Sequence, residues 1–465
     1  MLAMVQSTML SSPLIDGTDP LDRLTSPPEG DRDLVCRAPD AEQPWQVSVA
    51  RCAGLAEDVI VLSDGVVRVG REAGAGADLV LPDPSVSRVH ATCVVGRGAD
   101  HVEVTDEQSR NGVYVNGARV HRATVREGDV VRFGDAVVVV TRGASLDDRS
   151  SAIVGRSVRI DELRSTLRRL APSMLPVLVA GATGTGKELV ARALHAGSGR
   201  TGRFVAINCA ALPSALVENV LFGHRRGAYT SATADAEGAF AEASGGTLFL
   251  DEIGDLSLEA QPKLLRALEN GEISPVGATR SVTVDVRVVC ATNTPLDEAL
   301  ARGAFRRDLY ARVAGIVVET PALARRREDI VTLFRSFLAG RDRPMTADFA
   351  ESLLLHGWPH NVRELRSLAE RLTVLFPDAV SWERAMLDEP IRRPVSTSPP
   401  VTRAESVRPA AIRTVPRRPP TREELGQLLS EHGGNVARAA QHAGRSRKQV
   451  YRWMDMHGLP RGTGR

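Results

Sequence analysis

The chain has 465 residues, more than one hydrophobic core usually supports, so its length predicts about two to four domains. Its composition, 43% hydrophobic and 25% charged, excludes wholesale disorder and a coiled-coil rod. No run approaches about 18 apolar residues and the N-terminus lacks the pattern of a secretory signal, so we expect neither a membrane span nor a leader. The five cysteines are scattered without a CxxC pair, which predicts buried thiols in a reducing cytoplasm.

The net charge of +2 hides an uneven distribution along the chain. Residues 390–465 carry fifteen Arg and Lys against five Asp and Glu, and the first 389 residues are correspondingly acidic. A basic tail on an acidic body indicates a contact with nucleic acid at the C-terminal end.

The N-terminal part divides into two segments. Residues 1–44 are rich in Ser, Pro, Asp and Thr without periodicity, which predicts a disordered arm. Between residues 45 and 143, short β-branched runs such as Val137–Val140 alternate with turn signals such as Asn116–Gly117. Short strands with this punctuation predict an all-β sandwich.

Four further segments follow. Residues 152–320 alternate apolar strands with helical patterns, which is typical of an α/β domain with a parallel sheet. Residues 321–388 have a helical period and predict a small attached helical lid. Residues 389–420, rich in Pro and Arg, predict an extended linker. Residues 421–460 predict three short helices, so the expected chain is multidomain: an all-β sandwich, an α/β domain with its lid, and an all-α unit.

A phosphate-binding loop is predicted between the strand Val177–Ala180 and the helical pattern after it. The loop and its first helical residues are Gly181, Ala182, Thr183, Gly184, Thr185, Gly186, Lys187 and Glu188. Glycines let main-chain N–H groups surround phosphates, the helix N-terminus adds a favourable dipole, and Lys187 would reach the β- and γ-phosphates. The alternative is a glycine-rich turn without a ligand. Glu188 stands where a Ser or Thr usually helps to bind Mg²⁺.

Two carboxylates, Asp251 and Glu252, end the apolar run Leu248–Leu250. In a parallel sheet this edge lies beside the phosphate-binding loop, where one carboxylate can hold Mg²⁺ and the other can polarise a water. Such a pair alone also ends ordinary strands. Together with Lys187 it predicts hydrolysis of ATP with Mg²⁺.

Residues 152–388 resemble the AAA+ domain of the bacterial enhancer-binding proteins, the activators of sigma-54 RNA polymerase. The segments that carry the resemblance are Gly184–Glu188, Asn208–Ala211, Leu221–His224, Gly245–Ile253, Pro275–Gly277, Ala291–Asn293, Phe305–Tyr310 and Trp358–Leu365. This family carries a glutamate at the position of Glu188, which removes the objection to that residue. The resemblance implies an ATPase that works as a hexameric ring, with nucleotide at each subunit interface.

The resemblance also implies roles for single residues of the ATP site. Asp251 would organise Mg²⁺ and Glu252 the attacking water. Asn208 would hold Glu252 away until the ring is primed. Asn293 resembles the first sensor, and Arg363, on the lid, resembles the second.

Two further features follow from the same resemblance. Arg306 and Arg312 match interface arginines that reach the γ-phosphate of a neighbouring subunit, with ordinary surface arginines as the alternative. Val154 and Gly155 resemble the adenine side of the site.

The sigma-54 contact loop of the family, Gly-Ala-Phe-Thr-Gly-Ala, is altered in this chain. The corresponding residues are Gly227, Ala228, Tyr229, Thr230, Ser231 and Ala232. The aromatic residue and Thr230 are kept, so we expect contact with sigma-54. Ser231 replaces a glycine that can require a positive φ, and Tyr229 adds a hydroxyl to an apolar tip. These changes leave open an ATPase of this family redirected to another use.

Residues 45–143 resemble a forkhead-associated (FHA) domain, whose loops recognise phosphothreonine. The expected binding residues are Arg71, Ser87, Arg88, Ser109, Arg110 and Asn111. Arg71 and Arg110 would donate charge-assisted hydrogen bonds to the phosphate, and Asn111 would hold the peptide backbone. His90 is expected to brace the neighbouring serine loop from inside the sandwich. The alternative is a degenerate domain that acts only as a spacer.

Residues 421–460 resemble the Fis-type helix-turn-helix that ends many enhancer-binding proteins. The expected DNA-binding residues are Arg445, Ser446, Arg447, Lys448, Gln449 and Arg452, on or before the recognition helix. Val450 and Trp453 are expected to pack inward. The alternative is a basic helix exposed to solvent.

The sequence therefore predicts a cytoplasmic activator that senses phosphothreonine, hydrolyses ATP as a homo-oligomeric, hexameric ring and binds DNA at enhancer sites. Its expected partners are sigma-54 RNA polymerase, DNA, and a phosphothreonine-containing protein or its own N-terminal arm, with no membrane. Two alternatives stay open. One is an ATP-binding, DNA-binding regulator that does not engage sigma-54. The other is a phosphopeptide-binding adaptor whose nucleotide only supports assembly.

Overall fold

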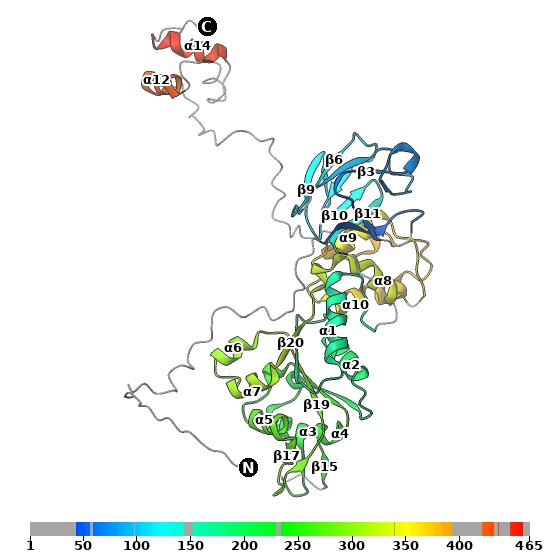
Figure 1. Ribbon diagram of the computed structural model, residues 1–465, viewed down its shortest axis with the longest axis vertical. Helices are drawn as coiled ribbons and strands as arrows, with labels where there is room; N and C mark the ends of the chain where they lie inside the picture. The colour runs from blue at the N-terminus through cyan, green and yellow to red at the C-terminus, as the bar shows by residue number, and fades with distance from the viewer. Residues whose placement is uncertain are drawn as a thin grey trace, which may run out of the picture.

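The computed structural model (Figure 1) describes most of the chain between residues 43 and 458. The described residues are 43–55, 59–96, 98–143, 152–228, 234–338, 340–392, 421–431, 436 and 447–458. The predicted N-terminal arm and the Pro- and Arg-rich linker lie almost wholly outside them. Among the described helices, none is long and apolar enough to cross a membrane.

The N-terminal β-sandwich consists of two sheets with the strand orders β2-β1-β11-β10-β7-β8 and β4-β3-β5-β6-β9. The strands of the first sheet are β1 (Trp45–Arg51), β2 (Val59–Val61), β7 (Val113–Val115), β8 (Ala118–Val120), β10 (Val130–Phe133) and β11 (Ala136–Arg142). Those of the second are β3 (Gly65–Gly70), β4 (Leu79–Val80), β5 (Ala91–Val95), β6 (Val102–Asp106) and β9 (Arg122–Val125). Alternate side chains, such as Val47 and Val138 from one sheet and Val67 and Val104 from the other, fill the core between them.

The α/β domain is built on five parallel strands in the order β13-β16-β19-β12-β20. They are β12 (Val177–Ala180), β13 (Phe204–Asn208), β16 (Thr247–Asp251), β19 (Arg287–Thr292) and β20 (Ile316–Glu319). Val177, Val179 and Phe249 face one side of the sheet, whereas Leu178, Leu248 and Leu250 face the other. Because helices cover both faces of the sheet, its central strands consist largely of consecutive apolar residues.

The two faces of this sheet carry different helices. Helices α1 (Val158–Leu170) and α2 (Lys187–Ala196) cover the first face. The second face is covered by α3 (Ser214–Phe222), α4 (Ala239–Glu242), α5 (Gln261–Asn270), α6 (Leu296–Ala301) and α7 (Arg307–Val313). Two hairpins, β14 (Gly223–His224) with β15 (Ala236–Glu237) and β17 (Glu272–Ile273) with β18 (Val282–Thr283), project at the far end of the domain (Figure 1).

A small helical domain follows β20. Its helices are α8 (Ile330–Phe337), α9 (Ala347–Leu355), α10 (Asn361–Leu375) and α11 (Glu389–Arg392), with 3₁₀ turns at Leu323–Arg325, Arg327–Asp329 and Arg384–Met386. Thr346 caps α9 by accepting a hydrogen bond from the N–H of Phe349. Phe334, Phe349 and Trp382 form the centre of its core.

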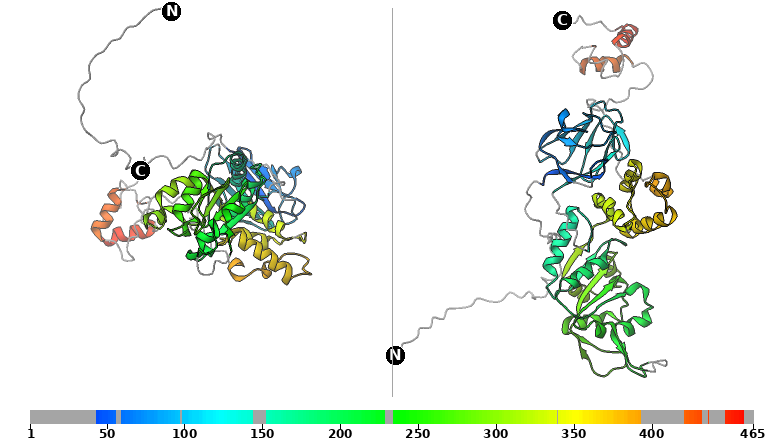
Figure 2. Two further views of the ribbon diagram at one scale, coloured as in Figure 1. Left: turned by 90° about the horizontal axis from the view of Figure 1, so that it is seen from below. Right: turned by 90° about the vertical axis from the view of Figure 1, so that its right-hand side faces the viewer.

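The β-sandwich docks on this helical domain (Figures 1 and 2). Val130, Val137 and Val139 point away from the core of the sandwich and share a buried apolar cluster with Leu353 and Leu354 of α9. Around this cluster the guanidinium of Arg132 lies 2.7 Å from the carboxylate of Asp348, and Arg327 donates a hydrogen bond to the main-chain oxygen of Gly128. The outer face of one sheet of the sandwich is therefore part of the core of the helical domain, whereas the interior of the sandwich forms a core of its own.

The C-terminal unit is described by two helices, α12 (Arg422–Glu431) and α14 (Arg447–Met456). Leu425, Val450, Trp453 and Met454 are buried between them, which confirms that Val450 and Trp453 pack inward. Arg452 is exposed. Of the other predicted DNA contacts, Arg445 and Ser446 lie outside the described residues, as do the side chains of Arg447, Lys448 and Gln449.

Candidate functional site

The predicted phosphate-binding loop joins the C-terminal end of β12 to the N-terminus of α2. Gly184 and Gly186 have φ angles of 78° and 105°, which favour glycine. A Cβ on Gly184 would stand 2.1 Å from the main-chain oxygen of His360. Glycine is therefore needed here both for the turn and for the close approach of the helical domain.

Side chains from three elements fix the shape of this loop. The hydroxyl of Thr185 donates to the main-chain oxygen of Ala182 at 2.8 Å and lies 2.7 Å from the hydroxyl of Thr320. Asn361, at the start of α10, donates a 3.0 Å hydrogen bond to the oxygen of Thr183. The sequence did not reveal the roles of Thr320 and Asn361, although Asn361 lies inside one of the recognised segments.

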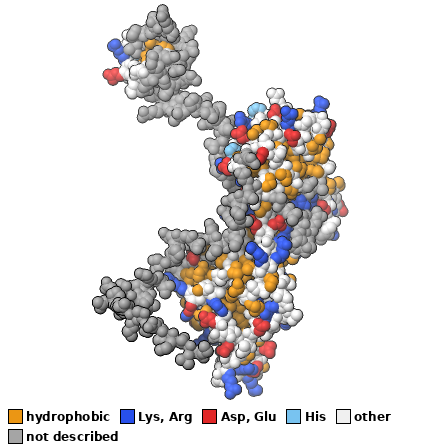
Figure 3. Space-filling view, viewed as in Figure 1, with side chains coloured by type: hydrophobic (Ala, Val, Ile, Leu, Met, Phe, Trp, Pro, Cys, Tyr) orange, Lys and Arg blue, Asp and Glu red, His pale blue; other side chains and the backbone are white. Residues whose placement is uncertain are grey.

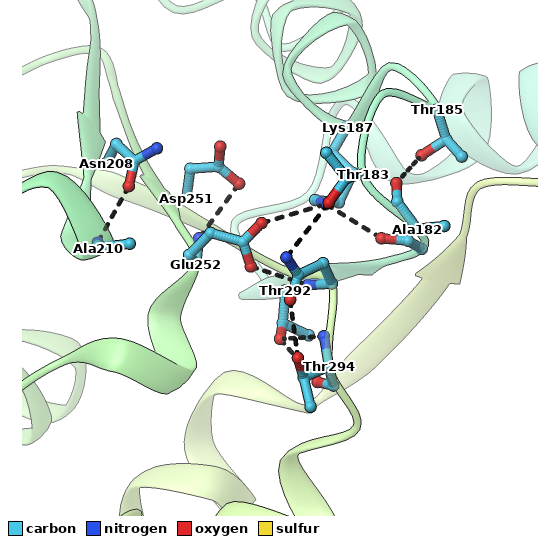
Figure 4. A network of polar contacts seen from close by, with 12 residues as sticks. Ala182, Thr183, Thr185, Lys187, Asn208, Ala210, Asp251, Glu252, Thr292 and Thr294 are labelled. Carbon is cyan, nitrogen blue, oxygen red and sulfur yellow. Dashed lines mark hydrogen bonds and ion pairs between the residues drawn. The ribbon is translucent and has the colours of Figure 1, made fainter. Parts of the chain in front are cut away.

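Lys187 and Glu252 meet beside the loop (Figure 4), and Asn293 contacts the same carboxylate. The Nζ of Lys187 donates to the main-chain oxygen of Gly181 at 3.0 Å and lies 3.5 Å from Oε1 of Glu252. The N–H of Asn293 donates to Oε2 of Glu252 at 2.9 Å, and its side chain donates to the hydroxyl of Thr183. The side chain of Lys187 is only 7% exposed, so the carboxylate compensates a buried cation.

The two carboxylates at the end of β16 have distinct positions. Asp251 accepts a 3.1 Å hydrogen bond from the N–H of Glu252 and is partly exposed beside the loop. Carboxylate oxygens of this kind suit Mg²⁺ bound together with substrate phosphates. Glu252 has a φ of 53°, a conformation that costs a non-glycine residue about 1–3 kcal/mol. Such strain is common where a side chain must be aimed at a reacting group.

Asn208 and Glu252 make no hydrogen bond with each other in the described part of the chain. The Oδ1 of Asn208 instead accepts hydrogen bonds from the N–H groups of Ala210 and Ala211 (Figure 4). Both residues lie at the ends of neighbouring strands, since Asn208 pairs with Asp251 in the register of β13 and β16. The structure thus shows Glu252 turned toward Lys187, and the restraint expected from Asn208 is not formed.

Two other predicted residues flank the loop. Arg363 on α10 is exposed, and its Cβ lies 3.1 Å from where a Cβ on Gly184 would stand, so it reaches the site from the helical domain. Glu188 lies on the surface of α2, where Arg192 donates two hydrogen bonds of 2.7 and 2.9 Å to its carboxylate. Glu188 is therefore turned away from the loop.

The predicted adenine side is held by two residues that the sequence did not suggest. Arg164 on α1 donates to the main-chain oxygens of Ile153 and Gly155. Asp329 lies so close that a Cβ on Gly155 would stand 2.8 Å from its carboxylate. Val154 packs against the apolar core of the helical domain. No sequence signal marks Arg164 or Asp329, because single charged residues on helices are ordinary.

Arg306 and Arg312 do not converge on the nucleotide residues of their own chain. Arg306 precedes α7 and makes two hydrogen bonds, of 3.0 and 2.6 Å, to Asp308. Arg312, in the last turn of α7, donates to the main-chain oxygen of Leu268. Helix α7 covers the face of the sheet opposite α2, which carries Lys187.

The predicted sigma-54 contact loop lies at the hairpin of β14 and β15. Gly227 and Ala228 are described, whereas residues 229–232 lie outside the described part. Arg225 and Asp235 form an ion pair of 2.6 Å at the base of this loop. Lys and Arg side chains gather at this end of the molecule (Figure 3).

The loops of the β-sandwich bring several predicted phosphothreonine-binding residues together. The N–H of Arg71 donates to the main-chain oxygen of Ser87, and the N–H of Arg110 donates to the Ser87 hydroxyl at 3.2 Å. Asn111 donates a 2.7 Å hydrogen bond to the main-chain oxygen of Ser85. The side chain of Arg71 is partly exposed and pairs with Glu72. Three loops thus present their polar groups at one end of the sandwich.

His90 and Ser109 support these loops from within. His90 is buried; its Nδ1 accepts from the N–H of Ser87 and its Nε2 donates to the oxygen of Gly112, which confirms the predicted bracing role. Burial lowers the pKa of His90, so the imidazole is neutral as these bonds require. Ser109 is also buried and accepts from the N–H of Gly112, whereas Arg88 is exposed.

Comparison with known families assigns three of the described domains. Residues 153–319 match the sigma-54 interaction domain family. Residues 67–134 match the FHA domain family, and residues 324–402 match the AAA+ ATPase lid domain family. The fold class predicted from the sequence, an FHA sandwich followed by an α/β AAA+ domain with a helical lid, is therefore confirmed.

Individual proteins are similar to this chain over part of their length. The chain is 46% identical over 256 residues to the DNA-binding transcriptional regulator NtrC of Bradyrhizobium sp. (strain RP501 Parasponia), covering 54% of this chain and 53% of that protein. It is 41% identical over 319 residues to the transcriptional regulatory protein ZraR of Salmonella typhimurium, covering 66% and 70%. A crystal structure of NtrX from Brucella abortus in complex with ATP is similar with a TM-score of 0.47 and 33% identity, covering 67% and 70%.

The similarity covers only part of each of these relatives. The chain spans about half the length of the NtrC relative and somewhat more than two thirds of the ZraR relative. With a sigma-54 interaction domain, an AAA+ lid and an added FHA domain, the chain belongs to the family of sigma-54-dependent transcriptional activators.

Proposed function

We propose that this chain is an ATPase that couples hydrolysis of ATP to the activation of sigma-54 RNA polymerase. The observation that carries the proposal is the convergence of Lys187, Asp251 and Glu252 at the ends of β12 and β16, below a preformed loop. Such a loop supplies main-chain N–H groups for phosphates without a cost of reorganisation at the moment of reaction.

Each residue has a role that follows from its position. Lys187 binds the β- and γ-phosphates in place of its present contact with Glu252. Glu252, once free of that contact, accepts a proton from a water aimed at the γ-phosphate, while Asn293 keeps the carboxylate in place. Asp251 would hold Mg²⁺, which would supply positive charge beside the phosphates.

The site is completed by a second subunit. Arg306 and Arg312, at the two ends of α7, are both exposed and so are available to a neighbour in a ring. An arginine that neutralises transition-state charge is typically worth about 10³–10⁵ in rate. We therefore infer a homo-oligomer, with a hexamer as the form that the family resemblance implies. Contact between Arg306 and a neighbour's γ-phosphate would require its pair with Asp308 to open.

Contact with sigma-54 is assigned to the hairpin loop of residues 227–232, and contact with DNA to the C-terminal unit. In the sequence the loop falls between β14 and β15, and β15 lies at the end of the AAA+ domain away from the lid (Figure 1). The ion pair of Arg225 and Asp235 closes its base. The basic tail fits a partner with a phosphate backbone.

The FHA domain is proposed to receive the regulatory signal as a phosphothreonine. Arg71 and Arg110 would neutralise the phosphate, the Ser87 hydroxyl would donate to it, and Asn111 would bind the peptide backbone. The ligand is a phosphothreonine-containing protein or the N-terminal arm of the same chain, which contains Thr18 and Thr25.

Run-off transcription by sigma-54 polymerase tests the first part of the proposal. The purified chain should stimulate transcription with ATP and not with a non-hydrolysable analogue. ATP turnover without any stimulation, at protein concentrations where the chain assembles, would instead favour a regulator that does not engage sigma-54.

Capture on a degenerate phosphothreonine peptide library tests the second part. The chain should bind the phosphorylated library and not its unphosphorylated counterpart, and Arg71→Ala should remove the difference. Equal retention on both libraries would contradict phosphothreonine recognition and favour a spacer role for the FHA domain.

A further inference from the structure

Arg51, at the C-terminal end of β1, connects the FHA domain to the lid. Its Nε donates a 3.2 Å hydrogen bond to the main-chain oxygen of Met345, in the segment before α9. Its Nη1 lies 2.7 Å from Oδ2 of Asp83 and also donates to the main-chain oxygen of Asp135. One guanidinium thus holds the lid on one side and a loop of the FHA domain on the other.

Asp83 connects Arg51 to Ser85, which lies beside the recognition loops. Its Oδ2 accepts from the N–H of Ala53 as well as from Arg51, and its Oδ1 accepts from the N–H and the hydroxyl of Ser85 at 3.0 and 2.6 Å. The side chain is only 3% exposed. Although burial opposes ionisation, the hydrogen bonds from Ser85 and Ala53 and the charge of Arg51 lower the pKa of Asp83, so it is a carboxylate at neutral pH.

Ser85 completes the connection. Its main-chain oxygen accepts the 2.7 Å hydrogen bond from the side-chain amide of Asn111, the residue assigned to the backbone of a phosphopeptide. Its hydroxyl also accepts a 2.6 Å hydrogen bond from the N–H of Asp135. A continuous set of hydrogen bonds therefore runs from Asn111 through Ser85, Asp83 and Arg51, and we refer to the last three residues as the relay.

The lid carries the connection to the ATP site. From Met345 the chain enters α9, and the indole of Trp358 donates a 2.9 Å hydrogen bond to the oxygen of Leu353 near the end of that helix. Two residues later, the oxygen of His360 abuts Gly184 of the phosphate-binding loop. A movement of the segment from Met345 to His360 would therefore change both the contact with Arg51 and the contact with the phosphate-binding loop.

We propose that the relay couples occupancy of the phosphothreonine site to the position of the lid. A peptide that takes the amide of Asn111 removes the donor that holds the main-chain oxygen of Ser85, so the segment around Ser85 can shift. Because the N–H and hydroxyl of Ser85 both donate to the Asp83 carboxylate, a shift of Ser85 changes the position of Asp83 and of the Arg51 guanidinium paired with it. Arg51 transmits that change to Met345. The inference rests on the proposed phosphothreonine function of the FHA loops, and linkage requires nucleotide to affect those loops in return.

This reciprocity allows a test that needs no phosphopeptide. Hydrogen exchange of the main-chain amides of residues 83–90 and 109–112 is measured in the full chain with and without saturating ADP. We expect ADP to change their exchange by about fivefold or more, the lower end of typical coupling between sites. Arg51→Ala and Asp83→Asn should abolish this response while ADP still binds.

Arg132→Ala is the matched control, because Arg132 crosses the same interface to Asp348 and lies outside the relay. It should keep the response. The relay is overturned if wild type shows no response, if Arg51→Ala and Asp83→Asn both respond like wild type, or if Arg132→Ala loses the response equally. Loss of phosphothreonine capture with an intact ADP response would instead remove the proposed ligand and support the coupling.

Discussion

The main-chain N–H of Asn293, the residue that follows β19, donates a 2.9 Å hydrogen bond to the carboxylate of Glu252, the residue that follows β16. This contact uses Oε2, while Oε1 faces Lys187. The proposed base is thus fixed by a main-chain group that no side-chain substitution removes. When phosphates bind, Glu252 has to give up only its contact with Lys187, which then binds the phosphates.

Glu252→Gln should therefore stop turnover without preventing nucleotide binding. A glutamine keeps the size and the contact with Asn293, but it cannot accept the proton of the water. We expect the rate of phosphate release to fall about 10²–10⁴-fold, while the ADP affinity stays within a small factor of wild type. Glu242→Gln, a surface residue paired with Arg203, serves as the matched control. Phosphate release from Glu252→Gln at the wild-type rate would contradict this mechanism.

Gly184→Ala should weaken nucleotide binding by separating the loop from the lid. The new Cβ would meet the oxygen of His360 at 2.1 Å, in addition to the strain of a positive φ. Gly199 also has a positive φ, 72°, but has nothing within 4 Å of its Cβ position, so Gly199→Ala isolates the strain alone. We expect a tenfold or greater loss of ADP affinity, about 1.4 kcal/mol, for Gly184→Ala only. Titration calorimetry of both variants checks this, and equal affinities would argue against the close approach.

Much of the ATP site could be predicted from the sequence because its chemistry depends on local order. Lys187 follows a glycine-rich turn after a strand, and Asp251 and Glu252 follow another strand, so the parallel sheet alone brings them together. Asn361 and Asp329 could not be found in this way, since they reach the site only through the packing of the lid.

The docking of the FHA domain on the lid has a signature in the sequence. Val137, Val138, Val139 and Val140 are all buried, although a strand with one solvated face alternates apolar and polar residues. Two of them fill the sandwich and the other two meet the lid. A continuous apolar run predicts a covered outer face, but it does not name the covering element.

Arg306→Ala should abolish turnover in homogeneous assemblies and recover part of it when mixed with Lys187→Ala subunits. Arg306 would act on the nucleotide of a neighbour, so a mixed ring contains some sites with both groups intact. We expect a loss of about 10³-fold or more for each variant alone. Phosphate release is measured at several mixing ratios. If the two variants co-assemble and no ratio restores activity, Arg306 does not act across the interface.

Glu328, a carboxylate at the junction of the FHA domain and the lid, is expected to make the folding stability of the chain depend on pH. Glu328 follows Arg327, which donates a 2.9 Å hydrogen bond to the oxygen of Gly128 in the FHA domain. Burial, and then the charge of Asp329, raises the pKa of Glu328 to about 8 from an ordinary value of 4.5. The folded state therefore holds this proton more tightly than the unfolded state.

The contribution of Glu328 to stability is complete below about pH 4.5 and is lost as the pH rises to about 8. Glu127 of the FHA domain adds to this shift and Arg159 opposes it. We expect the melting temperature of wild type to fall more steeply between about pH 5 and pH 8 than that of Glu328→Gln. Glu370→Gln, at an exposed pair with Arg366, should follow wild type. Parallel curves for wild type and Glu328→Gln would contradict a raised pKa.

Opening of promoter DNA by sigma-54 polymerase tests the central claim most directly. Strand separation is followed by a fluorescent base analogue at the start site, with polymerase, ATP and either the wild-type chain or Glu252→Gln. We expect wild type to open the DNA with ATP, Glu252→Gln to bind ATP without opening it, and opening by sigma-70 polymerase to be unchanged by the chain. Opening by Glu252→Gln as fast as by wild type, or no opening by a wild-type chain that hydrolyses ATP, would contradict it.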